Sequence, residues 1–244
     1  MNVITSLMNE KVKNWTKLNQ KKYRDLTDTF LIEDLHLITE ALKYDLVEEI
    51  ISLNDEEYDV PCYKVTEEIM NKISSQMSGA KIIAVCKKIS LEKVGNKILI
   101  LDNIQDPGNL GTIIRSAVAF NIETIVLSND CVDLYNSKVI RSTEGMLFNI
   151  NIIRKDLINF ISKLKEEGYK IYSTNVSGGT DVNDITLTSK VAIVMGSEGH
   201  GVRREINELC DDYIYIKMNK LCESLNVGVA TSIILYEMNK KMEG

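Results

Sequence analysis

The first segment that could do chemistry is a polar loop after the apolar run 98–101. It reads Asp106-Pro107-Gly108-Asn109-Leu110-Gly111, and Arg115 follows about one turn into the expected helix. The glycines let the backbone turn tightly and approach a ligand, and the free N–H groups at a helix start favour an anion. The alternative is an ordinary strand-to-helix turn in which Asn109 caps the helix and Arg115 is solvated. The loop is not a Walker phosphate loop, because the terminal Gly-Lys-Ser/Thr is missing.

A second polar loop follows the apolar run 191–195 and is rich in glycine. It reads Gly196-Ser197-Glu198-Gly199-His200-Gly201. A glutamate on a loop that glycines hold open can accept hydrogen bonds from a ligand or take up a proton. The alternative is a glycine-rich connection with an exposed acid, in which His200 is a surface or packing residue.

The third segment leads from a strand-like run at 213–217 into the C-terminal helix. It reads Ser224-Leu225-Asn226-Val227 and continues with a run that is apolar on nearly every side. Ser224 is a good N-cap, with Val227 in the first turn, and this is its structural interpretation. A helix that is apolar all round is expected to be buried over its whole circumference. Such burial requires an enclosing loop or a partner subunit.

The elements that position these loops alternate between strand and helix after residue 95. Strands are expected near 97–102, 124–128, 149–153, 170–174, 191–195 and 213–217. Helices are expected near 111–120, 136–144, 156–167, 202–209 and 225–240. This alternation predicts an α/β fold with a mostly parallel sheet that is covered on both faces. Ligands then bind at the carboxyl ends of the strands, where the polar loops lie.

The residues before this region form a second, smaller α/β module. The pattern predicts a helix over 34–42, an edge strand or connection over 60–65 because of Pro61, and a strand over 82–86. The charged stretch 87–96 precedes the strongest strand pattern in the chain, and we place the domain boundary there. The predicted domains are residues 1–94 and 95–244.

The composition is that of an ordinary globular chain and excludes several classes of protein. The 244 residues are 44% hydrophobic and 26% charged, and the apolar runs are far shorter than the ~20 residues that span a bilayer. Polar residues near the N-terminus argue against a signal peptide. The five cysteines form no C-x-x-C pair and there are only two histidines, which argues against disulfides and metal sites. We therefore expect a cytoplasmic protein with no membrane association and no metal.

The net charge of −6 argues against a strongly basic, nonspecific nucleic-acid binder, yet the charge is unevenly distributed. Residues 1–24 carry six bases and one acid, whereas residues 45–59 carry seven acids and no base. The first stretch could bind RNA, with Trp15 or Tyr23 stacking on a base. Its candidate phosphate contacts are Lys13, Lys17, Lys21 and Arg24. The alternative is a solvated helix face in which Trp15 serves packing.

Taken together and in this order, the three polar segments resemble the motifs of the SpoU (TrmH) family, a branch of the SPOUT RNA methyltransferases. The resemblance is close over about residues 96–244. It extends more loosely to the N-terminal module, which resembles the family's ribosomal-protein-like RNA-binding domain. The residues that carry this second resemblance are Ile4-Thr5-Ser6, Asn9, Val12-Lys13, Arg24 and Phe30-Leu31-Ile32-Glu33. The chain departs from the family pattern at Asp34, where glycine is frequent, at Lys217, where proline is frequent, and at Gly228, where serine is common.

The resemblance implies transfer of a methyl group from S-adenosylmethionine to a ribose 2′-hydroxyl of structured RNA. It also implies a homodimer whose catalytic domain contains a deep trefoil knot. The residues that match the family's cofactor-binding positions are Thr174, Gly196, Ile216 and Leu225. Those that match its catalytic and RNA-contacting set are Asn109, Arg115, Glu198, Ser224 and Asn226. The expected substrate is 23S ribosomal RNA, because a module of this kind commonly accompanies it.

The sequence leaves several alternatives open. Transfer RNA is the alternative substrate, and a catalytically silent RNA-binding protein of the same fold is the alternative function. A nucleotide-dependent oxidoreductase ranks last, because no Gly-x-Gly-x-x-Gly follows the first strand of the large domain. Arg115 is the family's leading candidate for the base, but a guanidinium stays charged in proteins, so we expect it to clamp a phosphate and polarise the hydroxyl. A phosphate oxygen or Glu198 would then accept the proton.

Overall fold

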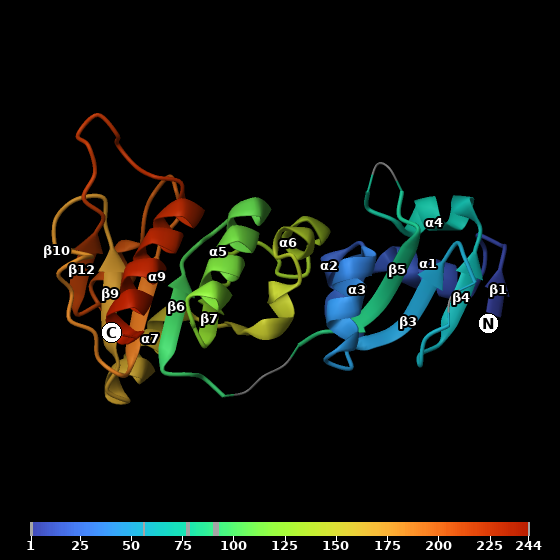
Figure 1. Ribbon diagram of the computed structural model, residues 1–244, viewed down its shortest axis with the longest axis horizontal. Coiled ribbons are helices and arrows are strands. Elements are labelled where there is room, and N and C mark those ends of the chain that lie inside the picture. Colours follow the sequence, from blue (N-terminus) through green and yellow to red (C-terminus); the bar gives the residue numbers. More distant parts are fainter. Residues whose placement is uncertain (1, 56, 77–78, 90–92, 244) are drawn as a thin grey trace. The chain divides into compact units, whose positions relative to one another are not determined.

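The computed structural model describes residues 2–55, 57–76, 79–89 and 93–243 and divides into two compact units (Figure 1). One unit comprises residues 1–89 with 133–148, and the other comprises residues 90–132 with 149–244. The division between residues 94 and 95 stays a prediction. Nothing in the sequence indicated that residues 133–148 join the first unit.

The first unit is built on a five-stranded sheet with the order β1-β4-β3-β5-β2. Its strands are β1 (Asn2–Ile4), β2 (Thr29–Glu33), β3 (Val47–Ser52), β4 (Cys62–Val65) and β5 (Ile82–Lys87). The strand β5 runs antiparallel to β2 and β3, and the other pairs are parallel. The prediction of an edge strand or connection at 60–65 is wrong, because β4 pairs with both β1 and β3. Pro61 lies just before β4, so its missing N–H interrupts no hydrogen bond of the ladder.

The helices of the first unit bury apolar side chains, with one exception. They are α1 (Glu10–Lys17), α2 (Lys21–Thr27), α3 (Leu35–Leu42), α4 (Glu67–Ile73) and α6 (Ser137–Ser142), and the 3-10 turn Met146–Asn149 follows α6. The exception is α2, whose buried residue is Arg24. One core cluster joins Trp15 of α1 and Ile69 of α4 to Ile51 and Ile83 of the central strands. These side chains are at most 3% exposed, so their burial stabilises the module.

Asp34 begins α3 in a backbone conformation that glycine adopts more readily. Its φ is 151°, which side chains with a Cβ rarely tolerate. The Asp34 carboxylate accepts a hydrogen bond from the N–H of His36 at 2.7 Å and so caps the helix. The cap offsets part of the strain at a position where the family frequently has glycine.

Residues 133–148 cover the strand β2 within the first unit. The Asp133 carboxylate pairs with the Arg24 guanidinium at 2.5 Å, and the Tyr135 ring packs on Phe30 with 4.5 Å between ring centres. Arg141 donates to the Ser75 hydroxyl at 3.3 Å. This segment therefore forms part of the first unit's structure, although it lies between two strands of the second sheet in the sequence.

The second unit is built on a seven-stranded sheet with the order β10-β12-β9-β11-β6-β7-β8. Its strands are β6 (Lys97–Leu101), β7 (Thr124–Leu127), β8 (Asn151–Arg154), β9 (Lys170–Thr174), β10 (Thr180–Asp181), β11 (Val191–Met195) and β12 (Asp212–Tyr215). Every pair is parallel, which confirms the predicted α/β class. Sequence patterns missed β10, because two residues are too short to show a period.

Helices cover both faces of this sheet. They are α5 (Pro107–Ala119), α7 (Leu157–Glu166), α8 (Arg204–Asn207) and α9 (Val227–Glu243). Helices α7 and α8 pack on the face that presents Ile98 and Ile100. Helices α5 and α9 pack against each other and lie side by side in front of the sheet in Figure 1.

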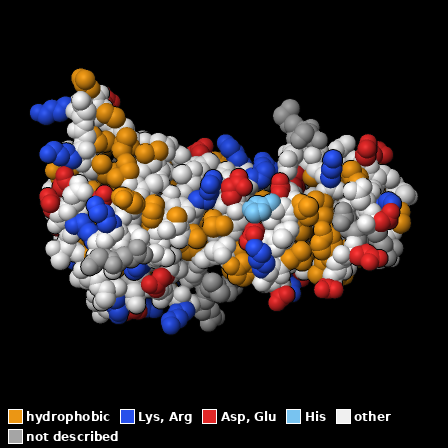
Figure 2. All heavy atoms as spheres, in the orientation of Figure 1, with side chains coloured by type: hydrophobic (Ala, Val, Ile, Leu, Met, Phe, Trp, Pro, Cys, Tyr) orange, Lys and Arg blue, Asp and Glu red, His pale blue; other side chains and the backbone are white. Residues whose placement is uncertain are grey.

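The helix α9 is not buried over its whole circumference in a single chain, contrary to expectation. Ile234, Leu235 and Met238 are at most 2% exposed, but Val229 and Tyr236 are 47% and 51% exposed. Hydrophobic side chains gather over α9 and the loop that leads into it (Figure 2). Within the residues described, no helix is long and apolar enough to cross a membrane.

Candidate functional site

The order in which the chain adds strands to the second sheet reverses beside β6, and the polar loops lie at that point. The chain leaves β6 toward β7 and β8, whereas β11 lies on the other side of β6, between β6 and β9. Loops from neighbouring parallel strands meet at the carboxyl edge of such a sheet and form its usual ligand site. The loops that follow β6, β9, β11 and β12 therefore lie where a ligand is expected to bind.

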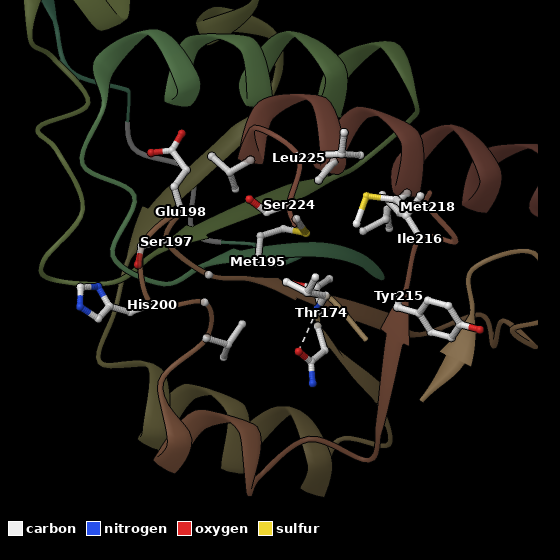
Figure 3. Close-up of a pocket in the computed structure, with 18 of the residues that line it drawn as sticks. Thr174, Met195, Ser197, Glu198, His200, Tyr215, Ile216, Met218, Ser224 and Leu225 are labelled. Carbon is white, nitrogen blue, oxygen red and sulfur yellow. Dashed lines mark hydrogen bonds between the residues drawn. The ribbon is translucent and has the colours of Figure 1, made fainter. Parts of the chain in front are cut away.

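A pocket opens between the loops that follow β9, β11 and β12 and the start of α9 (Figure 3). It has about 910 Å³ of empty volume, part of which is open to solvent. All four residues predicted to bind the cofactor line it, namely Thr174, Gly196, Ile216 and Leu225. The predicted catalytic residues Glu198 and Ser224 line it as well.

Asn109, Glu198 and Asn226 meet through their side chains, although each comes from a different segment of the chain. The Asn109 and Asn226 amides both donate to Oε1 of Glu198, the second at 3.2 Å. The Asn226 amide also donates to Oδ1 of Asn109 at 2.9 Å. Of the predicted catalytic residues, these three form one hydrogen-bonded cluster, in which two amides orient one carboxylate.

The cap of α5 explains why the Asn109 side chain is available. The helix begins at Pro107, and Oδ1 of Asp106 accepts the N–H of Asn109 at 2.9 Å. Asp106 is therefore the N-cap, and the alternative in which Asn109 caps the helix is wrong. Proline fits the first helical position because it lacks the N–H that would be unpaired there.

Asn226, rather than Ser224, caps α9. Oδ1 of Asn226 accepts the N–H groups of Gly228 and Val229 at 3.0 and 3.2 Å. These bonds leave Nδ2 of Asn226 to face Asn109 and Glu198. The structural interpretation of Ser224 as an N-cap is wrong, since Ser224 is exposed and lies in the pocket wall.

Gly196 is required where the glycine loop leaves β11. A Cβ atom at this position would lie 2.0 Å from the carbonyl carbon of Gly201. Ser197 and Gly201 bond each other through both backbone N–H groups, at 3.1 and 2.8 Å. The loop therefore folds back on itself with no room for a side chain at its start, and Glu198 lies in its turn.

Comparison with known proteins agrees with this geometry. Residues 96–236 match the family described as SpoU rRNA Methylase, and residues 9–84 match an MRM3-like substrate binding domain. The chain belongs to the SpoU rRNA methylase family. It is 37% identical to the 23S rRNA (guanosine(2553)-2′-O)-methyltransferase RlmP of Bacillus subtilis, over 98% of this chain and 99% of that protein.

Solved structures of related enzymes share the whole fold. An AdoMet-bound rRNA methyltransferase from Sinorhizobium meliloti is 28% identical with a TM-score of 0.88, and the match covers 98% of this chain and 97% of the other. A structure described as an RNA 2′-O ribose methyltransferase is 27% identical with a TM-score of 0.82, and the match covers 99% and 100% of the two chains. The similarity therefore includes both units of this protein.

Local contacts position Thr174 and Ile216, two of the residues that the SpoU resemblance predicts to bind the cofactor. Thr174 ends β9, and its hydroxyl donates to the carbonyl of Val194 at 2.9 Å. Ile216 directly follows β12 and lies in the pocket wall, while Lys217 is exposed. Lysine in place of the family's frequent proline therefore leaves Ile216 at the pocket.

Arg115 lies outside the hydrogen-bonded cluster. It is eight residues after Pro107, about two turns into α5 rather than one, and its side chain is exposed. Its neighbour Ser116 faces α9, where its hydroxyl bonds that of Ser232 at 2.7 Å. Among the residues described, no hydrogen bond or ion pair of the Arg115 side chain is found, so the guanidinium is available to a ligand.

The predicted RNA contacts of the first unit do not all share one surface. Lys17 and Lys21 are exposed and Lys13 is half-buried, whereas Arg24 is 7% exposed and pairs with Asp133. The prediction that Arg24 contacts phosphate is corrected, because its guanidinium is buried and also donates to the Leu18 carbonyl at 2.7 Å.

The aromatic residues of the basic stretch have different environments. Trp15 is 3% exposed and donates to Glu49 at 2.7 Å, which confirms its packing interpretation. Tyr23 is half-buried, and the ammonium groups of Lys17 and Lys22 lie 5.7 and 5.9 Å from its ring centre. Contact between Tyr23 and RNA stays a prediction.

Sequence patterns missed part of the pocket wall and the group that supports it. The missed wall residues include Asn175, Asn207, Tyr215 and Met218. The supporting group is Asp102, which directly follows β6 and binds Arg203 at 2.8 Å. A carboxylate immediately after a buried strand was the available signal, because that position lies at the carboxyl edge of the sheet. Within the described part of the chain, no group of three or more His, Cys, Asp or Glu residues could hold a metal ion.

Proposed function

We propose that this chain transfers a methyl group from S-adenosylmethionine to a ribose 2′-hydroxyl of 23S ribosomal RNA. The observation that carries the proposal is the cluster of Asn109, Glu198 and Asn226 beside a pocket built from three loops. The name of the relative RlmP describes 2′-O-methylation of a guanosine in 23S rRNA, and the Sinorhizobium meliloti structure contains AdoMet. A ribosomal RNA substrate also implies a cytoplasmic location.

The pocket suits the proposed cofactor. Gly196 and the neighbouring loops present backbone groups to it, while Ile216, Leu225 and Val227 provide apolar walls for the adenine ring. When bound, S-adenosylmethionine supplies a methyl group on a sulfonium sulfur that leaves as a neutral thioether, so the transfer needs no metal activation. The role of this chain is then to hold the cofactor, orient the ribose and accept or direct one proton.

The hydrogen-bonded cluster and Arg115 have different roles in positioning the RNA and directing its proton. Asn109 and Asn226 hold the Glu198 carboxylate in one orientation toward the ribose. The exposed guanidinium of Arg115 clamps a substrate phosphate and polarises the hydroxyl, since a guanidinium presents several N–H donors that match phosphate oxygens. Glu198 or the clamped phosphate oxygen then takes the proton. Ser224, on the pocket wall, contacts the RNA.

The Arg115→Ala variant tests this division. We expect it to abolish methyl transfer while leaving cofactor affinity nearly unchanged, because Arg115 does not line the pocket. An equal loss of transfer and cofactor affinity would assign Arg115 to cofactor binding instead.

The exposed face of α9 supports a homodimer formed through the C-terminal domain. Val229 and Tyr236 on α9 and Leu221 on the preceding loop are 47%, 51% and 94% exposed in one chain. A second copy would remove this apolar surface from water. Sedimentation velocity tests the proposal: the wild type should sediment as a dimer and Tyr236→Glu as a monomer. A monomeric wild type at micromolar concentration would contradict it.

The substrate is tested with purified protein, labelled S-adenosylmethionine and separate unmodified ribosomal and transfer RNA pools. Label should enter 23S RNA, and mapping of alkali-resistant linkages should locate it on a ribose 2′-oxygen. Label in transfer RNA alone would replace the proposed substrate, and no label in either RNA would refute the proposed activity. Glu198→Gln keeps the size of the side chain and serves as the matched site variant.

The first unit is proposed to bind RNA through α1 and α2. Replacing Lys13, Lys17 and Lys21 with alanine should make the RNA association constant less sensitive to salt. The steepness of the fall of its logarithm against log salt concentration should decrease by about 2 to 3, because each phosphate contact releases close to one counterion. Arg24→Ala is the contrasting variant. Because Arg24 is buried and paired with Asp133, its removal should lower the stability of the protein but change the salt slope little. An unchanged slope in the triple variant would favour the solvated helix face.

A further inference from the structure

The glycine loop is closed at both of its ends by a single residue, Asp102. The N–H of Asp102 donates to the carbonyl of Met195, the last residue before the loop, at 2.8 Å. The Asp102 carboxylate accepts the N–H of Arg203, just after the loop, at 2.9 Å. The residues before and after the loop are therefore tied to the same point at the end of β6.

The Arg203 side chain strengthens this closure. Its Nε and Nη2 both reach Oδ1 of Asp102 at 2.8 Å, while its backbone N–H uses Oδ2. Asp102 is fully buried, so the pair is shielded from water at the carboxylate end. The hydrogen bond from Arg203 to Asp102 is the main cause of the raised pKa of the guanidinium. The carboxylate has no alternative partner of this strength within the described residues.

The loop between these ends is stiff, so its orientation follows from its ends. Gly196 contacts Gly201 without room for a Cβ, and Ser197 and Gly201 bond each other twice. Glu198 lies in this turn, whereas Asn109 lies in the first turn of α5, which follows Asp102 and the connection from β6. Fixing the loop to Asp102 therefore fixes Glu198 relative to Asn109.

We infer that Asp102 and Arg203 form a positioning pair that orients Glu198 for methyl transfer. The inference rests on the proposed function, and neither residue lines the pocket or joins the hydrogen-bonded cluster. Without the pair, the loop would remain attached to β11 before it and to α8 after it, but could tilt away from Asn109. Because a misplacement of about 1 Å can cost roughly 100-fold in rate, the pair should affect turnover more than binding.

The main experiment compares Arg203→Ala and Arg203→Lys with Arg204→Ala. Arg204 is the matched control, since its side chain is 90% exposed and bonds only Glu208 at 2.8 Å among the residues described. We expect kcat to fall about 30-fold in Arg203→Ala and less in Arg203→Lys, which retains a charge, with wild-type kcat in the control. The dissociation constant of S-adenosylmethionine, measured by calorimetry, should rise less than about threefold, since other loops form most of the pocket wall.

The double variant Asp102→Asn/Arg203→Ala covers the case in which Arg203→Ala fails to fold. It removes the buried Asp102 carboxylate that Arg203→Ala would leave unpaired. Its kcat should be no lower than that of the slower of the two single variants, Asp102→Asn and Arg203→Ala, because the two residues act as a unit. Folded Arg203 variants with wild-type kcat would overturn the inference. So would a fall in kcat that merely matches the loss of cofactor affinity.

Hydrogen exchange separates this inference from the proposed function. Amides of residues 201–203 should exchange faster in Arg203→Ala than in Arg204→Ala, whether or not any RNA is methylated. If the wild type methylates no RNA, the proposed function fails, and the exchange data still decide whether the pair holds the loop. Equal exchange in the two variants would overturn the pair's structural role even in an active enzyme.

Discussion

The Asn226 side chain both caps α9 and joins the cluster, and two substitutions separate these roles. Oδ1 accepts two helix N–H groups, while Nδ2 donates to Asn109 at 2.9 Å and to Glu198 at 3.2 Å. Serine and aspartate rank with asparagine as N-caps, so both should preserve α9. Neither supplies the amide donor, so both should disrupt the cluster.

The magnitudes follow from these contacts. A neutral hydrogen bond is worth about 1 kcal/mol and one to a charged group about 1.5–3 kcal/mol, and we use a combined value of about 2 kcal/mol because the site is exposed. Asn226→Ser should therefore reduce kcat/KM roughly 30-fold. Asn226→Asp adds repulsion between two carboxylates, about 1.3 kcal/mol at this separation in water, for a total reduction of roughly 300-fold.

The assay measures methyl transfer to 23S RNA and urea unfolding on the same samples. Asn226→Ser and Asn226→Ala both lose the cluster bonds, but only Asn226→Ala also loses the cap, so its free energy of unfolding should be lower than that of Asn226→Ser by about 1 kcal/mol. If Asn226→Ser and Asn226→Asp stayed within threefold of wild-type kcat/KM, the cluster would not be part of the reaction. A loss of activity proportional to a loss of stability would assign Asn226 to capping alone.

Three further predictions follow from local geometry. Gly196→Ala should abolish cofactor binding measured by calorimetry, because its Cβ would lie 2.0 Å from Gly201; retained affinity would show that the loop can open. At Asp34, whose φ is 151°, the glycine variant should be more stable than the alanine variant by about 1–2 kcal/mol in urea unfolding; the reverse order would contradict backbone strain. The pKa of Asp25 is lowered to about 2 from 3.8 by hydrogen bonds from Lys21 and Lys88, so its stabilisation is present above pH 3.8 and lost as pH falls through 2. Because Asp25 is largely exposed, this contribution should stay below about 1 kcal/mol, and an NMR titration with a midpoint near 4 would contradict it.

The sequence predicted the second sheet and much of the site for one physical reason. Its strands are short apolar runs separated by amphipathic helices, a pattern that requires a covered parallel sheet. Parallel strands place the residues that follow them at one edge, so Asn109 and Glu198 could be expected to approach each other. The hydrogen bonds between them depend on side-chain orientation, which only the structure shows.

Details that depend on distant partners or on helix ends were not predictable. Arg24 is buried because Asp133, 109 residues away, pairs with it. Asp106 and Asn226 cap their helices in place of Asn109 and Ser224, because several good capping residues lie close together and the helix start decides among them. No local pattern in the sequence distinguishes these possibilities.

Residues 133–148 limit how this protein can be divided or recombined. Phe30 is fully buried and packs against Tyr135, so an N-terminal fragment that stops at residue 94 would expose that ring to water and leave Arg24 without its carboxylate. Exchange of RNA-recognition modules between relatives by a single crossover near residue 94 would therefore mismatch this packing. Compatible chimaeras need two further junctions, one before residue 133 and one after residue 148. Among relatives, divergence at Phe30 should be accompanied by divergence at Tyr135.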